Sequence, residues 1–108
     1  MKRILYLLIA LLTVSSGYCQ TAKEYFYRGV AKDSLLDYKG AISDYTKAIE
    51  INPENKVGYY YRGLTKRKLK AYNEAIADFE KAIEIDPEFA EAYYNRGVLY
   101  LFLGESYM

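Results

Sequence analysis

The chain has 108 residues, enough for one small domain, and its 15 basic and 14 acidic residues give a formal charge of +1. This balance gives no reason to expect binding to nucleic acid or to acidic membranes through bulk electrostatics. The sequence has no histidine and one cysteine, so it lacks the usual general base near pH 7 and the usual zinc ligands. We therefore predict a protein that is not an enzyme and that uses no cofactor or metal.

Residues 1–19 predict a secretory signal peptide. Two basic residues near the start precede a short apolar stretch, and small residues follow it before Cys19. The apolar stretch is shorter than the about 20 residues that a membrane-spanning helix needs. We expect cleavage after Cys19 and export to the bacterial periplasm, the cell envelope or the medium. The alternative is a lipoprotein anchored to a membrane through Cys19, and the bulky Tyr18 before it argues against this.

The rest of the chain is built on a repeat of 34 residues. Residues 59–87 match residues 25–53 after a shift of 34 positions, and the first half of the same unit returns at residues 93–104. A fixed period of this length is typical of solenoid proteins, in which each unit buries its apolar face against its neighbours. We expect the middle unit to be the most stable, because it alone is flanked on both sides.

Each complete unit predicts two helices. Between residues 38 and 49 the apolar positions recur at i, i+3, i+4 and i+7, which indicates an amphipathic helix. The break before this helix is short, so the two helices of a unit must pack antiparallel. Asp37 is the predicted N-cap of the second helix. Gly29 and Gly63 are predicted to face the alanines of that helix, where a larger side chain would overpack the contact.

The repeated residues resemble the tetratricopeptide repeat (TPR) family, whose marks are an aromatic residue, Gly, Tyr, Ala, an aromatic residue, Ala and Pro. In the second unit these marks fall on Tyr59, Gly63, Tyr72, Ala75, Phe79, Ala82 and Pro87, and in the first on Tyr25, Gly29, Tyr38, Ala41, Tyr45, Ala48 and Pro53. The resemblance implies an all-α solenoid of antiparallel helix pairs. Its TPR repeats would be residues 22–55 and 56–89, with only the first helix of a third repeat at 90–108. One departure is that arginine precedes the repeated glycine, where the family has leucine.

The same resemblance implies a concave groove lined by the first helix of each unit. The candidate peptide-binding residues in this groove are Phe26, Tyr27, Val30, Tyr60, Tyr61, Leu64, Tyr94, Asn95 and Val98. Aromatic side chains suit peptide recognition, but they serve equally well as packing between neighbouring helices. Some TPR domains hold a peptide carboxylate with a clamp of Lys, Asn and Arg. The matching positions here are Phe26, Val30, Tyr61, Glu91 and Asn95, so we do not expect recognition of chaperone tails by such a clamp.

The helix of the partial third unit is predicted to be apolar on all sides. Its candidate interface residues are Leu99, Leu101, Phe102 and Leu103. Either the chain is a truncated piece of a longer array, or this helix docks onto another chain. We predict a non-enzymatic protein–protein interaction module with a protein or peptide partner and no nucleic acid. The alternative is a structural role through self-association or extension of the array, with membrane contact only if Cys19 is lipidated.

Overall fold

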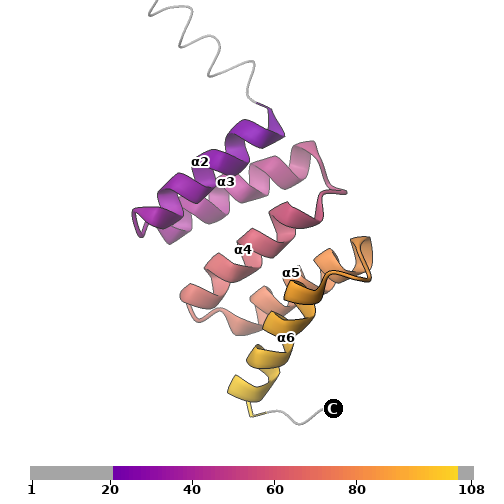
Figure 1. Ribbon diagram of the computed structural model, residues 1–108. Coiled ribbons are helices and arrows are strands. Elements are labelled where there is room, and N and C mark those ends of the chain that lie inside the picture. The colour runs from indigo at the N-terminus through magenta and orange to yellow at the C-terminus, as the bar shows by residue number, and fades with distance from the viewer. Residues whose placement is uncertain (1–20, 105–108) are drawn as a thin grey trace, which may run out of the picture.

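The computed structural model describes residues 21–104, and this part of the chain contains five α-helices and no β-strand (Figure 1). The helices are α2 (Ala22–Ser34), α3 (Tyr38–Ile51), α4 (Lys56–Lys68), α5 (Tyr72–Ile85) and α6 (Ala90–Phe102). The predicted all-α solenoid is confirmed. The predicted signal peptide and its cleavage site lie outside the described residues. Within residues 21–104, no helix combines the length and the hydropathy needed to cross a bilayer.

The helices stack in two layers, as Figure 1 shows, with α2, α4 and α6 toward the viewer and α3 and α5 behind them. Each odd-numbered helix packs between the even-numbered helices before and after it, since α3 contacts α2 and α4, and α5 contacts α4 and α6. The first helices of all three units therefore share one face of the protein. This arrangement places the groove candidates on a common surface.

Local capping explains where the helices begin and turn. Thr21 caps α2 through a capping box, in which its hydroxyl accepts from the Glu24 backbone N–H at 3.2 Å and the Glu24 carboxylate accepts from the Thr21 N–H at 2.9 Å. Asp37 accepts from the Gly40 N–H at 3.0 Å, which confirms it as the N-cap of α3. Leu36 and Lys70 take equivalent places in the two turns within the units, with φ of 67° and 64°. These left-handed residues reverse the chain between antiparallel helices.

One glycine in each complete unit, Gly29 or Gly63, allows the two helices of that unit to approach closely. A Cβ atom at Gly29 would lie 2.7 Å from the Tyr45 ring, and one at Gly63 would lie 2.8 Å from the Phe79 ring. Both rings are completely buried. The prediction that these glycines face the second helix of their unit is confirmed.

A cluster of buried apolar residues centres on α5. Its buried members are Ile49, Tyr59, Ala75, Ile76, Phe79, Ala82, Ala92 and Leu99. They come from α3, α4, α5 and α6, so the second unit is covered on both sides. Leu99 is 1% exposed and packs in this core. Its prediction as an interface residue is therefore wrong, because one face of α6 is needed to cover α5.

The arginine that departs from the family pattern forms an ion pair inside each complete helix pair. Arg28 donates to both carboxylate oxygens of Asp44 at 3.2 and 3.1 Å, and Arg62 donates to both oxygens of Asp78 at 2.9 and 2.7 Å. In each unit a lysine one turn later adds a contact of 3.0 Å to the same aspartate. Both aspartates are buried, so a forked polar contact holds the two helices where leucine would pack in the family.

Candidate functional site

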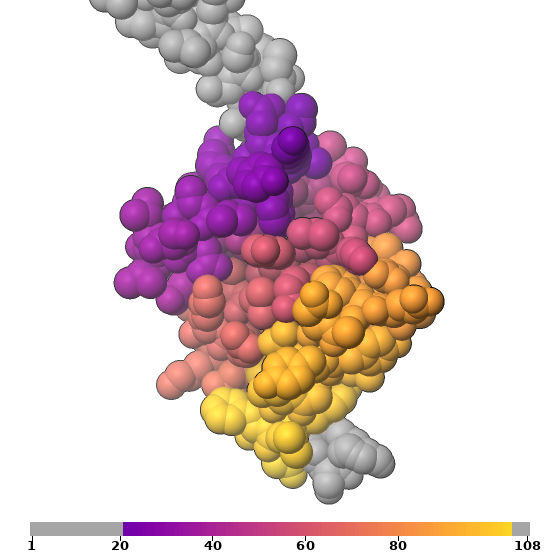
Figure 2. All heavy atoms as spheres, viewed as in Figure 1, coloured from indigo at the N-terminus to yellow at the C-terminus, as the bar shows by residue number. Residues whose placement is uncertain are grey.

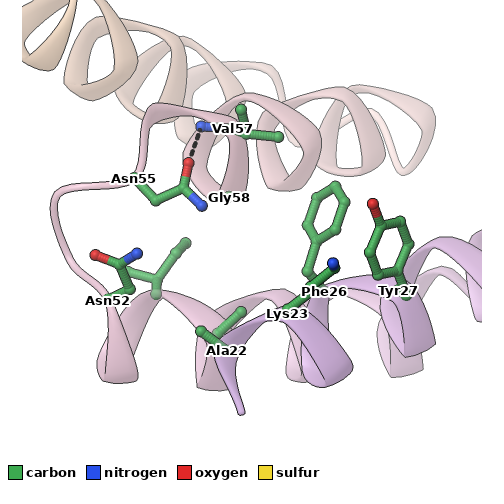
Figure 3. A pocket seen from close by; sticks show the side chains of 10 residues that line it. Ala22, Lys23, Phe26, Tyr27, Asn52, Asn55, Val57 and Gly58 are labelled. Atoms are coloured by element: carbon green, nitrogen blue, oxygen red, sulfur yellow. Dashed lines mark hydrogen bonds between the residues drawn. The ribbon is translucent and has the colours of Figure 1, made fainter.

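A cavity of about 350 Å³ lies between the N-terminal ends of α2 and α4 and the C-terminal end of α3. Its lining residues are Ala22, Lys23, Phe26, Tyr27, Ala48, Ile49, Asn52, Asn55, Val57 and Gly58. Figure 3 shows Phe26 and Tyr27 rising from α2 toward α4, with Asn55 on the opposite side near the start of α4. The cavity is mostly apolar, with polar side chains at its edge. That combination is common in sites that bind small molecules or peptide side chains.

The aromatic candidates of the first two units form a continuous row beside this cavity. The Phe26 ring lies 5.3 Å from Tyr27 and 5.0 Å from Tyr61, and Tyr61 lies 5.9 Å from Tyr60, all as ring-centroid distances in edge-to-face geometry. Tyr27 is 58% exposed and Tyr61 is 37% exposed, whereas Phe26 is half-buried. Figure 2 shows the face of the molecule on which α2, α4 and α6 lie toward the viewer. The structure thus brings together Phe26, Tyr27 and Tyr61 as an accessible aromatic surface.

A second cavity, of about 340 Å³, lies at the other end of the contact between α2 and α4. Val30, a predicted groove residue, lines it together with Tyr61 and Tyr45. Asp33 at its edge accepts from the Thr65 hydroxyl and from the Lys68 ammonium, each at 2.7 Å. These bonds join the first unit to the second. They close part of the cavity and leave it more polar than the first.

The buried hydroxyl of Tyr45 has no hydrogen-bond partner among residues 21–104. Burial raises the pKa of Tyr45 to about 12, and the nearby negative charge of Asp33 acts in the same direction. The hydroxyl is therefore held neutral, although the nearby Thr65 hydroxyl acts on the pKa in the opposite direction. A buried hydroxyl without a hydrogen bond is a cost to the folded state.

Three predicted groove residues pack between the second and third units. The Tyr60 ring lies 4.9 Å from the Phe89 ring, and the Asn95 side-chain amide donates to the Tyr60 hydroxyl at 3.0 Å. Burial raises the pKa of Tyr60, and the charge of Glu91 adds to the effect. Asn95 also accepts from the Arg67 guanidinium at 2.7 Å and is 7% exposed, while Leu64 packs on the core. Tyr60, Leu64 and Asn95 hold the units together, and little of their surface faces solvent.

The remaining candidates lie on α6. Tyr94 is 72% exposed and stands apart from the aromatic row. Val98 lines a third cavity, of about 310 Å³, next to Phe102. Leu101 and Phe102 are 80% and 67% exposed, and Leu103 is partly buried against the core. Two of the four predicted interface residues are thus fully on the surface.

Sequence reasoning missed the polar edge of the first cavity. Asn55 lies outside the helices and was not a candidate, yet its side-chain oxygen accepts from the Val57 N–H at 3.0 Å and so caps α4 at the cavity edge. A signal was present, because the two complete units differ at this position, with Asn55 in one and Phe89 in the other. No cluster of acidic, cysteine and histidine side chains suited to a metal ion occurs in the part of the chain that the structure describes.

Comparison with known families decides what the repeat is. Family models described as tetratricopeptide repeats match residues 22–55 and 44–77, and one described as TPR repeat matches residues 63–104. The chain belongs to the TPR family. Comparison with curated proteins gives no match.

Solved TPR structures are similar to this chain over most of its length. The structure of MamA is 31% identical, with a TM-score of 0.77, and the match covers 78% of this chain and 49% of MamA. The second TPR domain of Spaghetti (RPAP3), solved with an HSP90 peptide, is 30% identical, with a TM-score of 0.75 and 79% of each chain covered. The TPR2B domain of yeast Sti1, in complex with pHsp70, is 35% identical, with a TM-score of 0.73, 76% of this chain and 66% of that chain covered. The chain thus spans about half of the MamA structure.

Proposed function

We propose that this TPR protein is a non-enzymatic protein–protein interaction module that binds a peptide segment along the contact between α2 and α4. The observation that carries the proposal is the apolar cavity of about 350 Å³ beside the exposed rings of Tyr27 and Tyr61. Aromatic rings offer a large, fairly rigid contact area with a polar end, so they bind peptides at a low cost in side-chain entropy. Structural neighbours solved with HSP90 and Hsp70 peptides support a peptide as the ligand class.

The peptide of this protein differs from those chaperone tails in what it offers to the groove. Two of the positions that would form a carboxylate clamp are Phe26 and Tyr61, whose rings contact each other, and a third is Glu91, which is exposed and acidic. None of the three can donate a charged hydrogen bond to a terminal carboxylate. We therefore propose that binding depends on apolar side chains of the peptide.

A selection from a random peptide library on the immobilised chain tests this function. The selected peptides are then titrated against the wild type, Tyr27→Ala and Tyr61→Ala, with Lys39→Ala as the control because Lys39 is exposed on α3 and lines none of the three cavities. We expect each tyrosine variant to bind about tenfold more weakly, since truncating an interface aromatic commonly costs more than about 1 kcal/mol. Unchanged binding by both tyrosine variants, with unfolding curves like the wild type, would count against a groove site.

We further propose that the protein works after export, on the strength of the N-terminal segment of the sequence. Mass spectrometry of the mature protein tests this directly. An unmodified chain that begins at Gln20 is the expected product. A diacylated Cys19 would instead assign the protein to the membrane surface, and a chain that retains residues 1–19 would refute processing.

A second candidate function is assembly through α6. Arg96 and Gly97 repeat the Arg–Gly pair that meets the second helix in the complete units, yet a Cβ at Gly97 would meet nothing within 4 Å. Among the described residues no second helix covers this face, and Leu101 and Phe102 beside it are exposed. An unpaired apolar helix face of this kind favours contact with a further helix, from a second copy or from more of the array.

Light scattering over a range of concentrations tests the assembly function. The variant Gly97→Leu is the informative one, because the site has room for the side chain within the described structure and the substitution would block a docking helix. Self-association that the variant abolishes supports assembly. A monomer at every concentration rules out assembly between copies of this chain.

A further inference from the structure

The cavity between α2 and α4 has a filled counterpart between α4 and α6. A shift of 34 residues moves Phe26 onto Tyr60 and Asn55 onto Phe89. At the second junction the Phe89 ring lies 4.9 Å from the Tyr60 ring, and the Lys56 ammonium lies 4.6 Å from the centre of the Phe89 ring. The two junctions share three of the ten lining positions, and within residues 21–104 an aromatic side chain fills only the second.

The residue before the first-helix N-terminus accounts for this difference. Asn55 and Phe89 precede α4 and α6 with similar backbone angles, φ −92° and ψ 107° for Asn55 and φ −77° and ψ 86° for Phe89. Asn55 turns its oxygen back to the Val57 N–H, so its short side chain stays at the cavity edge (Figure 3). Phe89 makes no capping bond, and its ring packs on the core. The backbone angles at this residue are therefore similar at the two junctions, and its side chain fills space at the second junction that it leaves open at the first.

We propose that the cavity between α2 and α4 receives an aromatic side chain of the bound peptide, in the place that Phe89 takes at the next junction. The inference rests on the proposed peptide-binding function and names the ligand group for it. The peptide ring would contact Phe26 as Phe89 contacts Tyr60, over the apolar side chains of Ile49 and Val57. The Asn55 amide nitrogen, turned toward the cavity in Figure 3, would donate to a backbone carbonyl of the peptide beside the ring.

Chain variants at Asn55 give the sharpest test. Asn55→Phe should place the protein's own ring in the cavity and weaken peptide binding at least tenfold, which is the order of affinity that burial of one aromatic side chain provides. Asn55→Ser is the matched control, because serine also caps a helix and leaves the cavity open. It should bind the library-selected peptides within about threefold of the wild type, the size of one lost hydrogen bond at a rim. Retained binding by Asn55→Phe would overturn the proposal.

The sequences of the selected peptides provide an independent test. Those that bind the wild-type chain should share one Phe, Tyr or Trp, and alanine at that position should weaken binding at least tenfold. Tight binding by peptides without an aromatic residue would refute the inference and leave the peptide-binding function standing.

A small probe covers the case in which no peptide is selected. N-acetyl-phenylalaninamide, titrated at millimolar concentration into the 108-residue chain, should shift the NMR signals of the Val57 and Gly58 amides in the wild type and in Asn55→Ser but not in Asn55→Phe. Such shifts without any selected peptide would support the aromatic site and count against the peptide-binding function. If the wild type shows no shift at these amides and no peptide carries an aromatic anchor, the inference is wrong.

Discussion

Replacement of Tyr45 by Phe should stabilise the protein. The Tyr45 side chain is completely buried and its hydroxyl has no hydrogen-bond partner among residues 21–104. The equivalent residue of the second unit is Phe79, which is equally buried and contacts Gly63 as Tyr45 contacts Gly29. A phenylalanine ring therefore fits this position without rearrangement. A buried polar group without a hydrogen bond costs about 1–3 kcal/mol, so we expect a gain of about 1 kcal/mol at pH 7 after allowance for the small void.

The same substitution should reduce the loss of stability that the protein shows as the pH rises above about 10. The pKa of Tyr45 is raised to about 12 in the folded state, while an exposed tyrosine titrates near 10. A raised pKa means that the folded state favours the neutral hydroxyl, so this contribution is complete below about pH 10 and is lost as the pH rises through about 12. Two pKa units correspond to about 3 kcal/mol over that window. Tyr45→Phe has no group to ionise here and should lose less stability.

Urea unfolding followed by circular dichroism at pH 7, 9, 10, 11 and 12 measures both effects. Tyr27→Phe is the control, since Tyr27 is 58% exposed and its hydroxyl is available to water. The expected result is a higher midpoint for Tyr45→Phe at pH 7 and a shallower decline above pH 10. If Tyr45→Phe is less stable than the wild type at pH 7, the hydroxyl makes a stabilising bond and the prediction is wrong; the Thr65 hydroxyl is the candidate partner.

Three further predictions concern the contacts within the helix pairs. Asp78→Asn should lower the free energy of unfolding, measured with urea, by about 3 kcal/mol, and Asp44→Asn should lower it by about 1 kcal/mol. The reason is that the cations paired with Asp78 are 17% exposed, whereas those paired with Asp44 are 44% and 35% exposed. Equal losses would show that burial of the cations does not matter. Burial alone would raise the pKa of Asp44, but hydrogen bonds from Arg28 and Lys32 outweigh it and hold that pKa below its usual value. The contribution of Asp44 is therefore present above about pH 4 and is lost as the pH falls through the lowered pKa, so the difference between wild type and Asp44→Asn should shrink in acid and not in base. Gly63→Ala should lower the thermal midpoint, because the methyl group would overpack against Phe79 by more than the gain in helix propensity offsets. Gly97→Ala should raise the free energy of unfolding by about 0.5–1 kcal/mol, because the added Cβ would meet nothing within 4 Å among the described residues. A loss of stability at both positions would contradict these predictions.

The fold was predictable because the chain contains two complete copies of the same 34-residue unit. The 34-residue period, the apolar spacing of the second helices and the N-cap at Asp37 each depend on local pattern, which one sequence contains. The Arg–Asp pairs were missed because charged residues on an amphipathic helix are usually solvated. A signal existed, since Asp44 falls between Ala41 and Ala48 on the apolar stripe of its helix. A charge at such a position needs a partner, and Arg28 supplies it.

The groove was predictable as a set of residues but not as a surface. Family resemblance places Tyr61, Tyr60 and Asn95 on the first-helix face, and that face exists. Which rings stay exposed depends on the neighbouring unit, because Phe89 covers Tyr60, while no aromatic residue among the described ones takes the equivalent position over Phe26. Leu99 shows the same limit, since its burial follows from the contact of α6 with α5. Sequence pattern gives the face of a helix, and burial requires knowledge of what packs on it.

The two complete units act as an internal comparison that separates packing from binding. The residues that hold a helix pair together, among them the Arg–Asp pair, the glycine and the alanines that it meets, are the same in both units. The cavity residues that differ from their counterparts one repeat later are Ala22, Lys23, Phe26, Asn52, Asn55, Val57 and Gly58. The change from Phe to Asn removes a core contact and opens a cavity, which destabilises the fold. The peptide site that we propose in this cavity offers a reason for that cost.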